Sequence, residues 1–279
     1  MNIDGWKYYN HAAIPTTAPH ENPNMNPIEN GAIWNIDGGT PLLVRWTTGF
    51  DCECETNFWY IIKDTPFDIN TLKAKRRYEI NKGLKNFEVK EIEAADYIEE
   101  LYSVQVLAFS VYPEKYRPAV NKEAFVSSVK QWKQYICMGA FNRETNELCG
   151  YALLMQKSEK YIELNVLKTK PEYEKKGVNA ALVEGILQFL NSFLKEGGYI
   201  CDGARSINHE TAFQDYLEKY FEFRKAYCKL HIRYNSMMSC VIKLIYPFRR
   251  VLLKMDGIGI IHSLNAILRM EQICREDSK

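Results

Sequence analysis

Residues Lys170–Leu190 read "KPEYEKKGVNAALVEGILQFL" and follow a strand-like run, "YIELNVLKT" at 161–169. Apolar spacing predicts an amphipathic helix from about Val178, closed by glycines at 197 and 198. Gly177 stands at the start of this helix, although glycine weakens helices. It therefore indicates either a turn with an unusual φ or a place where an anion approaches the backbone.

The start of this helix is a candidate phosphate site. The first amides of a helix have no intrahelical partner, and the helix dipole makes that end positive. Backbone amides and two basic side chains would form the cradle, from residues Lys175, Lys176, Gly177, Val178, Asn179 and Ala180. A valine at Gly177 is expected to leave the fold largely intact and to obstruct the phosphate.

The surrounding elements predict a mixed sheet. Turn residues at "RETNE" and "SEK" separate three strands between Cys137 and Thr169. From Phe87 to Tyr234 the predicted order is strand, two helices, three strands, helix, strand, helix, strand. This order indicates an α/β domain with a mixed sheet rather than a repeating parallel array.

The first 86 residues form a predicted N-terminal extension. Residues 1–40 are rich in Pro, Asn and Gly and are expected to be irregular, and "PLLVRWTT" and "NFWYIIKD" are predicted strands joined by an acidic turn. A helix is expected from Asp68 to a stop at Gly83. Its basic residues indicate a solvated face or a site for phosphate, carboxylate or RNA: Lys73, Lys75, Arg76 and Arg77. The sequence therefore predicts three parts of the chain: the N-terminal extension (1–86), the mixed-sheet domain (87–235) and a C-terminal tail (236–279).

The stretch "NVLKTKPEYEKKGVNAALVEGIL" resembles the signature of the GNAT acyltransferase superfamily. There a glycine loop opens a helix over the pyrophosphate of CoA. Glu174 stands where that family prefers Arg or Gln, and Asn179 where it prefers Gly or Ala. The resemblance implies a GNAT-like acyl-CoA N-acyltransferase fold with an N-terminal extension and a C-terminal helical tail. It also implies acetyl-CoA or another acyl-CoA as co-substrate, and no metal.

A narrower resemblance concerns the molecule that donates the transferred group. "LKAKRRYEINKGLKNFEV" and "ARSINHETAFQDYLEKYFEFRKAY" are similar to Fem-type aminoacyl transferases of peptidoglycan bridge synthesis. Those proteins usually carry two tandem GNAT units, whereas about 86 residues precede the recognisable unit here. The likeness implies, as an alternative, an aminoacyl-tRNA-dependent transferase with tRNA as a partner.

Catalytic candidates come from this resemblance and from local chemistry. The resemblance implies that amides near Val166 and Leu167 meet the acyl carbonyl, that Glu163 is the general base and that Tyr216 is the acid for the thiolate. An exposed strand glutamate and an aromatic packing residue are the structural alternatives. In "ARSINHET", His209 is a candidate base near neutral pH. The same segment offers substrate-binding Arg205 and Asn208, although Asn208 could instead cap the following helix.

Composition limits the classes of partner. Lys plus Arg is 36 and Asp plus Glu is 35, so no overall charge attracts nucleic acid and any basic site must be local. The 8 cysteines are scattered, and Cys52-x-Cys54 lacks a second ligand pair, so thiols in a reducing compartment are expected. The N-terminus has no basic and apolar leader regions, which predicts a cytoplasmic protein.

The tail from residue 236 to 279 holds 7 Lys or Arg and 4 Asp or Glu, a difference of +3. Apolar residues recur at helical spacing at Ile260, Leu264, Ile267 and Leu268. This pattern indicates packing on the domain or in a homodimer. The other interpretation is peripheral contact with a membrane, with basic residues at the headgroups: Arg249, Arg250 and Lys254.

These features together predict an acyl-CoA-dependent N-acyltransferase, with acetyl-CoA as the default donor. The acceptor is expected to be an amine of a small molecule or a cell-envelope precursor. Besides the aminoacyl-tRNA alternative, a GNAT-shaped binding protein without catalytic activity remains open, because fold alone does not fix activity.

Overall fold

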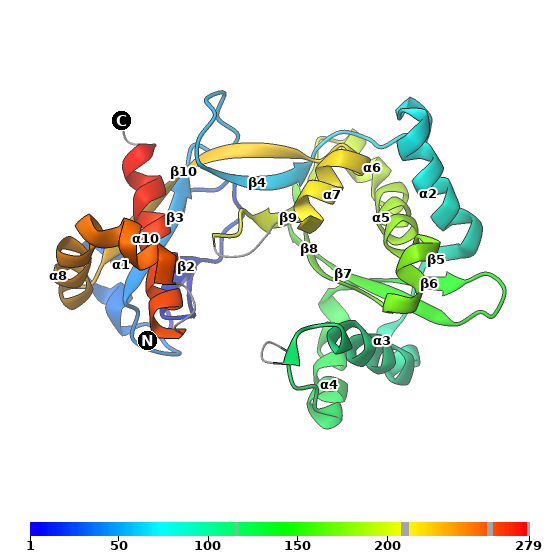
Figure 1. The fold of residues 1–279 in the computed structure, drawn as a ribbon, viewed down its shortest axis with the longest axis horizontal. Coiled ribbons are helices and arrows are strands. Elements are labelled where there is room, and N and C mark those ends of the chain that lie inside the picture. Colours follow the sequence, from blue (N-terminus) through cyan, green and yellow to red (C-terminus); the bar gives the residue numbers. More distant parts are fainter. Residues whose placement is uncertain (115–116, 208–211, 256–258, 278–279) are drawn as a thin grey trace. The chain divides into compact units, whose positions relative to one another are not determined.

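The computed structural model describes residues 1–114, 117–207, 212–255 and 259–277 (Figure 1). Contacts divide the chain into two compact units. One comprises 1–61, 204–212 and 225–279, and the other comprises 62–203 and 213–224. Segment 62–86 thus lies in the unit that holds the GNAT-like stretch, whereas the tail lies with the N-terminal segment.

The unit around 62–203 is built on a five-stranded run of sheet in the order β9-β8-β7-β6-β5. Neighbours from β5 to β8 are antiparallel, and β8 and β9 are parallel. The predicted three-strand meander and the order of elements from Phe87 are therefore confirmed. The strands are β5 (Phe87–Glu91), β6 (Ile136–Asn142), β7 (Leu148–Ser158), β8 (Tyr161–Thr169) and β9 (Tyr199–Ala204).

Helices cover both faces of this sheet (Figure 1). On one face, helices α3 (Ile98–Ser110) and α4 (Lys122–Val129) bury Leu101 and Phe125 against Tyr151 of β7. The other face is covered by α5 (Val178–Phe189), which continues into α6 (Asn191–Lys195). Helix α5 is buried over most of its circumference, because α2 (Ala74–Asn86) packs on its outer side. Helix α7 (Ala212–Phe221) follows β9.

Helix α2 differs from its sequence prediction at both ends. Asp68 caps a short helical turn at Ile69–Thr71 by accepting a hydrogen bond from the amide of Asn70, and α2 begins only at Ala74. Gly83 does not end the helix, which continues to Asn86. The predicted stop is wrong because Gly83 is needed inside the helix, where α5 lies against it.

The other unit is built on strands in the order β1-β2-β3-β10-β4. Residues 1–40 are not wholly irregular, since β1 and β2 form an antiparallel hairpin that buries Trp6. The two predicted strands of the extension exist as β3 and β4, but β10 lies between them. The strands are β1 (Trp6–Tyr9), β2 (Ala12–Pro15), β3 (Leu43–Thr48), β4 (Phe58–Lys63) and β10 (Arg224–Tyr234).

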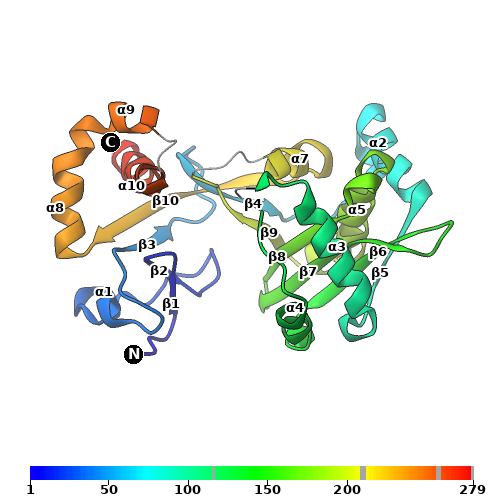
Figure 2. The same ribbon diagram turned by 60° about the horizontal axis from the view of Figure 1, so that its bottom comes forward.

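Two apolar clusters lie on opposite faces of this sheet. Val44 packs with Ile28 of the short helix α1 (Asn26–Glu29), whereas Leu43 packs with Met270 of α10 (Gly259–Glu276). Between β10 and α10 the chain forms α8 (Ser236–Ile245) and α9 (Arg249–Leu252), as Figure 2 shows. Among the described residues, no helix has the length and apolar character needed to cross a bilayer.

Candidate functional site

Strands β8 and β9 pair only at their beginnings. The ladder joins Tyr161 to Tyr199, Ile162 to Ile200 and Glu163 to Cys201, and it ends there although both strands continue. The pairing of β8 with β7 shifts at the same level, because Leu164 and Val166 have partners on β7 and Asn165 between them has none. Such a bulge bends a strand. The β9-facing edge of β8 beyond Glu163 is thus outside the ladder, where Val166 and Leu167 are predicted to offer amides.

Asp202 is the first residue of β9 beyond this ladder. Its neighbour Cys201 is fully buried on one face of the sheet, so the Asp202 side chain points to the other face. There it is hydrogen-bonded to Gln214 of α7. Burial raises the pKa of Asp202 to about 7, against the hydrogen bond from Gln214, which lowers it. A carboxyl group with this pKa can accept and release a proton near neutral pH.

Sequence reasoning missed Asp202. The available signal was an acidic residue in the otherwise apolar run "YICDGA". Aspartate is rare inside buried strands and is almost never fully buried unless it has a partner. The partner, however, lies on a helix whose position the sequence does not reveal.

Glu163, the predicted general base, lies on the opposite face from Asp202, because Cys201 is its ladder partner. Its carboxylate is 3.5 Å from Nζ of Lys157 and accepts a 3.4 Å hydrogen bond from Nδ2 of Asn165. The structure therefore does not bring Glu163 and Asp202 together. The catalytic role of Glu163 stays a prediction.

Tyr216, the predicted acid, packs within an aromatic cluster on α7. Its ring lies 5.1 Å from that of Tyr220 and 5.6 Å from that of Phe221. Burial, followed by the charges of Tyr220 and Glu79, raises the pKa of Tyr216, so its hydroxyl keeps its proton at neutral pH. Residues two apart on a helix point in nearly opposite directions, so Tyr216 does not share the face of Gln214 that meets Asp202.

Gly177 makes a close contact with helix α2. It ends a helical turn at Pro171–Lys176 with a φ of 90°, and α5 begins at the next residue. A Cβ at Gly177 would lie 2.9 Å from both Cα and N of Gly83. Nδ2 of Asn86 also donates a 2.9 Å hydrogen bond to the carbonyl of Lys176. One side of the loop is thus covered by backbone, and the expectation that a valine leaves the fold largely intact is wrong.

The rest of the predicted cradle surrounds the start of α5. The side chains of Val178 and Ala180 are buried, and Oδ1 of Asn179 accepts a 2.9 Å hydrogen bond from Oγ1 of Thr169. Lys175 and Lys176 are exposed. The first amides of α5 and these two ammonium groups remain the predicted hydrogen-bond donors to a bound phosphate.

Glu147 anchors the segment that leads into this loop. Its carboxylate accepts hydrogen bonds from Nζ of Lys170 at 2.5 Å and from the hydroxyl of Tyr173 at 2.6 Å. These two hydrogen bonds, that from Lys170 foremost, lower the pKa of Glu147. The residues on both sides of Pro171 are therefore held to the turn between β6 and β7.

We expect Glu147→Gln to lower the Tm at pH 7 and to have less effect at pH 3. A lowered pKa means that the ionised group stabilises the fold above its unfolded pKa, and that this stabilisation is lost as the pH falls. Thermal melts at both pH values check this, with the exposed Glu144→Gln in the same turn as control. A Tm difference that is equal at both pH values would contradict the assignment.

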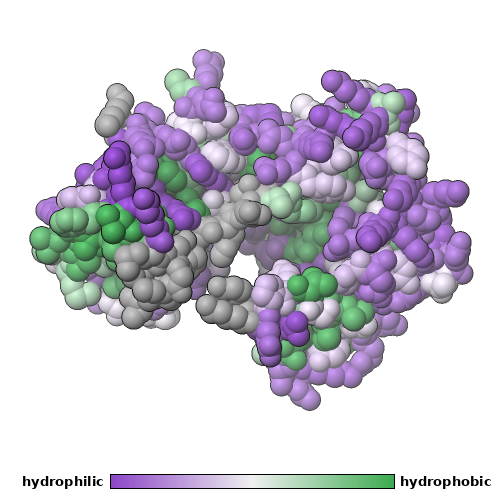
Figure 3. Space-filling model, viewed as in Figure 1, coloured by the Kyte–Doolittle hydropathy of each residue, from purple (hydrophilic) through white to green (hydrophobic). Residues whose placement is uncertain are grey.

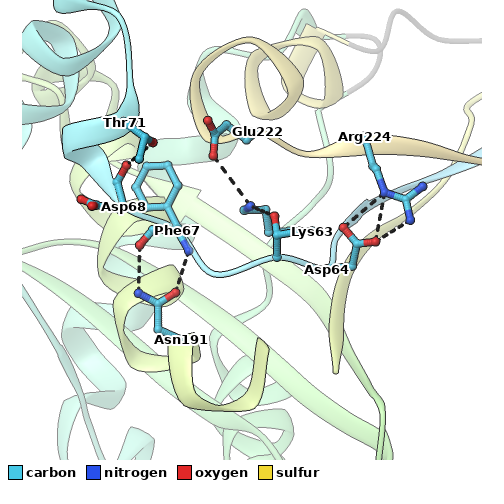
Figure 4. A network of polar contacts seen from close by, with 9 residues as sticks. Lys63, Asp64, Phe67, Asp68, Thr71, Asn191, Glu222 and Arg224 are labelled. Carbon is cyan, nitrogen blue, oxygen red and sulfur yellow. Dashed lines mark hydrogen bonds and ion pairs between the residues drawn. The ribbon is translucent and has the colours of Figure 1, made fainter. Parts of the chain in front are cut away.

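A polar network fixes the end of helix α7, which carries Gln214 (Figure 4). Arg224, just after α7, forms an ion pair with Asp64, and Glu222 lies 3.9 Å from Nζ of the fully buried Lys63. Nζ of Lys63 also donates a 2.5 Å hydrogen bond to Oγ1 of Thr65. These contacts hold the C-terminal end of α7 to the chain around Asp64.

Two other predicted site residues, Asn208 and His209, lie outside the described residues. Arg205, predicted to bind substrate, belongs to the unit of residues 1–61. Its guanidinium lies 4.4 Å from the ring centre of Trp59, and Nη1 donates a 2.5 Å hydrogen bond to the carbonyl of Asn57. Within the described ranges, no three His, Cys, Asp or Glu side chains gather as metal ligands would.

The parallel strand that parts from its neighbour, together with the glycine turn that opens α5, defines a GNAT-like fold. The chain is similar to the C-terminal domain of a putative lysylphosphatidylglycerol synthetase from Agrobacterium fabrum, at 10% identity and a TM-score of 0.52, over 85% of this chain and 82% of that one. It is also similar to L-PGS from Bacillus licheniformis (14% identity, TM-score 0.47, 86% and 84% covered).

A third similar structure is the ribosomal-protein-S18-alanine N-acetyltransferase from Escherichia coli (16% identity, TM-score 0.36, 51% of this chain and 81% of that one covered). No family model matches the sequence, and no curated protein matches it. At these identities the likeness concerns the fold alone.

Proposed function

We propose that the protein is an acyltransferase in which the acyl group is transferred where β8 and β9 part. The observation that carries this proposal is Asp202, a carboxyl group with a pKa near 7 at the first position beyond the ladder. The donor is an acyl-CoA, acetyl-CoA by default, and the acceptor is an amine of a small molecule or a cell-envelope precursor.

In the proposed reaction, the acceptor nitrogen attacks the carbonyl carbon of the thioester. The C–N bond forms, the C–S bond breaks, and the carboxylate of Asp202 takes the proton that the nitrogen loses. Amides of β8 near Val166 and Leu167 stabilise the negative oxygen of the intermediate. The departing thiolate takes a proton from water. Positioning and oxyanion stabilisation supply the rest of the rate.

A binding experiment tests the donor. At a CoA or acetyl-CoA concentration ~100 times the Kd, the native state gains about 2.7 kcal/mol, and the Tm rises by several degrees. The double variant Lys175→Glu/Lys176→Glu should lose most of this shift, whereas the exposed Lys195→Glu should keep it. If neither thioester nor free CoA raises the Tm, the acyl-CoA donor is excluded.

Two observations favour an aminoacyl-tRNA as the second candidate donor. The similarity to the lysylphosphatidylglycerol synthetase domain extends over both units of the chain. In addition, α2, which packs against the Gly177 loop through Gly83, carries exposed basic side chains, among them Lys75, Lys82 and Lys85. Filter binding with a charged tRNA panel distinguishes the donors. Binding of tRNA that is abolished by Lys82→Glu/Lys85→Glu, without a CoA shift, would replace the first proposal.

A further inference from the structure

Helix α8 has a wide apolar surface, of which one part is buried and the neighbouring part is exposed. Its inner face buries Met238 and Ile242 against Leu268 of α10. On its outer face, however, large side chains are exposed, and the chain beyond α8 continues the series: Met237 (65% exposed), Val241 (36%), Leu244 (72%), Phe248 (66%) and Val251 (61%).

These five residues follow one another at intervals of four, three, four and three positions. Within α8 that spacing places Met237, Val241 and Leu244 along one line of the helix, whereas Phe248 lies in a short helical turn at Tyr246–Phe248 and Val251 in α9. Figure 3 shows hydrophobic residues gathered over α8. Contiguous exposed apolar surface of this kind marks an interaction site, whereas single exposed apolar residues do not.

The charges of the same segment are of one sign. Residues 236–255 contain four basic residues and no Asp or Glu. Lys243, Arg250 and Lys254 are exposed. Arg249 lies with its guanidinium 4.4 Å from the ring centre of Tyr246. Lys243 lies on α8 and Arg250 on α9, so both helices that carry the exposed apolar side chains also carry an exposed cation.

We propose that the outer face of α8 and α9 docks onto the surface of an anionic lipid bilayer, with the helices parallel to the membrane plane. Exposed apolar side chains accompanied by basic and no acidic side chains are the pattern of helices that lie in the headgroup region. Basic side chains near such a surface are attracted by anionic lipids. A second copy of this chain fits the face less well, because two identical segments would place four cations opposite four cations.

Vesicle flotation tests the docking directly. At 0.1 M salt, we expect the full chain to float with vesicles of phosphatidylcholine containing about one third phosphatidylglycerol, and to bind pure phosphatidylcholine at least about tenfold more weakly. At 0.5 M salt, binding to the anionic vesicles should fall, because salt screens the attraction. No flotation with the anionic vesicles at 0.1 M salt overturns the proposal, as does equal binding to both compositions.

Two double variants, each with a control, test the exposed apolar side chains and the basic side chains separately. Leu244→Ser/Phe248→Ser should weaken binding to anionic vesicles at least about tenfold, because two apolar anchors are lost. Tyr78→Ser/Val111→Ser removes two side chains of similar exposure (67% and 61%) elsewhere and should have no effect. Equal loss in both variants overturns the proposal.

The second double variant, Lys243→Glu/Arg250→Glu, reverses two positive charges of this segment. Its control, Lys85→Glu/Lys130→Glu, reverses two exposed positive charges elsewhere in the chain. Only the first should reduce binding to anionic vesicles about tenfold or more. Far-UV circular dichroism confirms that each variant is folded. Sedimentation velocity tests the other possible occupant, a second copy of this chain. If the parent forms a dimer that dissociates in Leu244→Ser/Phe248→Ser and does not bind vesicles, the face belongs to a second copy and the proposal is overturned.

Discussion

Asp202→Asn is expected to lower kcat/KM by ~10²–10⁴-fold, the range for loss of a general base. Binding of the acyl donor should be unchanged, since Asn keeps the size and the hydrogen bond to Gln214 but cannot take a proton. Steady-state kinetics together with the donor-induced Tm shift measure the two quantities separately. Asp215→Asn, an exposed carboxylate on α7, is the matched control and should retain full activity.

The pH dependence provides an independent readout of the same carboxyl group. Because burial raises the pKa of Asp202 to about 7, kcat/KM of the parent should rise with pH through that value. A raised pKa also means that the protonated group favours the fold at low pH, and that this contribution is lost as the pH rises through about 7. The Tm of Asp202→Asn should therefore exceed that of the parent at pH 8 more than at pH 5.

A folded Asp202→Asn variant with parental kcat/KM and an unchanged pH profile would remove Asp202 from the reaction. Glu163→Gln should then be measured in the same way. Glu163 is the base that the family resemblance implies, and it lies on the opposite face of the sheet. A loss of activity in Glu163→Gln alone would place the acceptor on the side of α3 rather than that of α7.

Much of the fold was predictable because its signals are local. Alternating apolar runs separated by turn residues predicted the meander of β6, β7 and β8, and the structure confirms it. Strand partners that are distant in sequence were not predictable. Nothing in "PLLVRWTT" or "NFWYIIKD" shows that β10 lies between these strands, and the hairpin of β1 and β2 interrupts a stretch whose composition indicates loops.

The candidate site also has a part that local sequence signals predict and a part that they do not. The glycine turn before α5 could be predicted from the sequence, because a helix start has a local pattern. The raised pKa of Asp202 could not be predicted, because its cause is burial of the carboxyl group beneath a helix that comes later in the chain. Gly83 was misinterpreted for a related reason. The sequence rules treat Gly83 as a helix stop, whereas it lies inside α2 and packs closely against Gly177. The role of Gly177 as an anion site stays a prediction.

Gly177→Ala is expected to lower the stability of the unit around 62–203 substantially. At a φ of 90°, a residue with a Cβ is strained by about 1–2 kcal/mol. The new Cβ would lie 2.9 Å from two backbone atoms of Gly83, so α2 must move, and overpacking of this kind costs about 1–3 kcal/mol. A total of about 3 kcal/mol corresponds to a fall in Tm of about 6–12 °C for a unit of this size.

Differential scanning calorimetry of three alanine variants tests the reason for this glycine. Gly83→Ala should also lower the Tm, although alanine favours a helix interior by ~1 kcal/mol over glycine, because its Cβ would meet the Gly177 carbonyl and the Ala181 amide. Asn81→Ala, exposed on the same helix, should leave the Tm unchanged or raise it. If Gly177→Ala keeps the parental Tm and loses only the CoA-induced shift, the helix contact is incidental, and the glycine serves the approach of a phosphate to the start of α5.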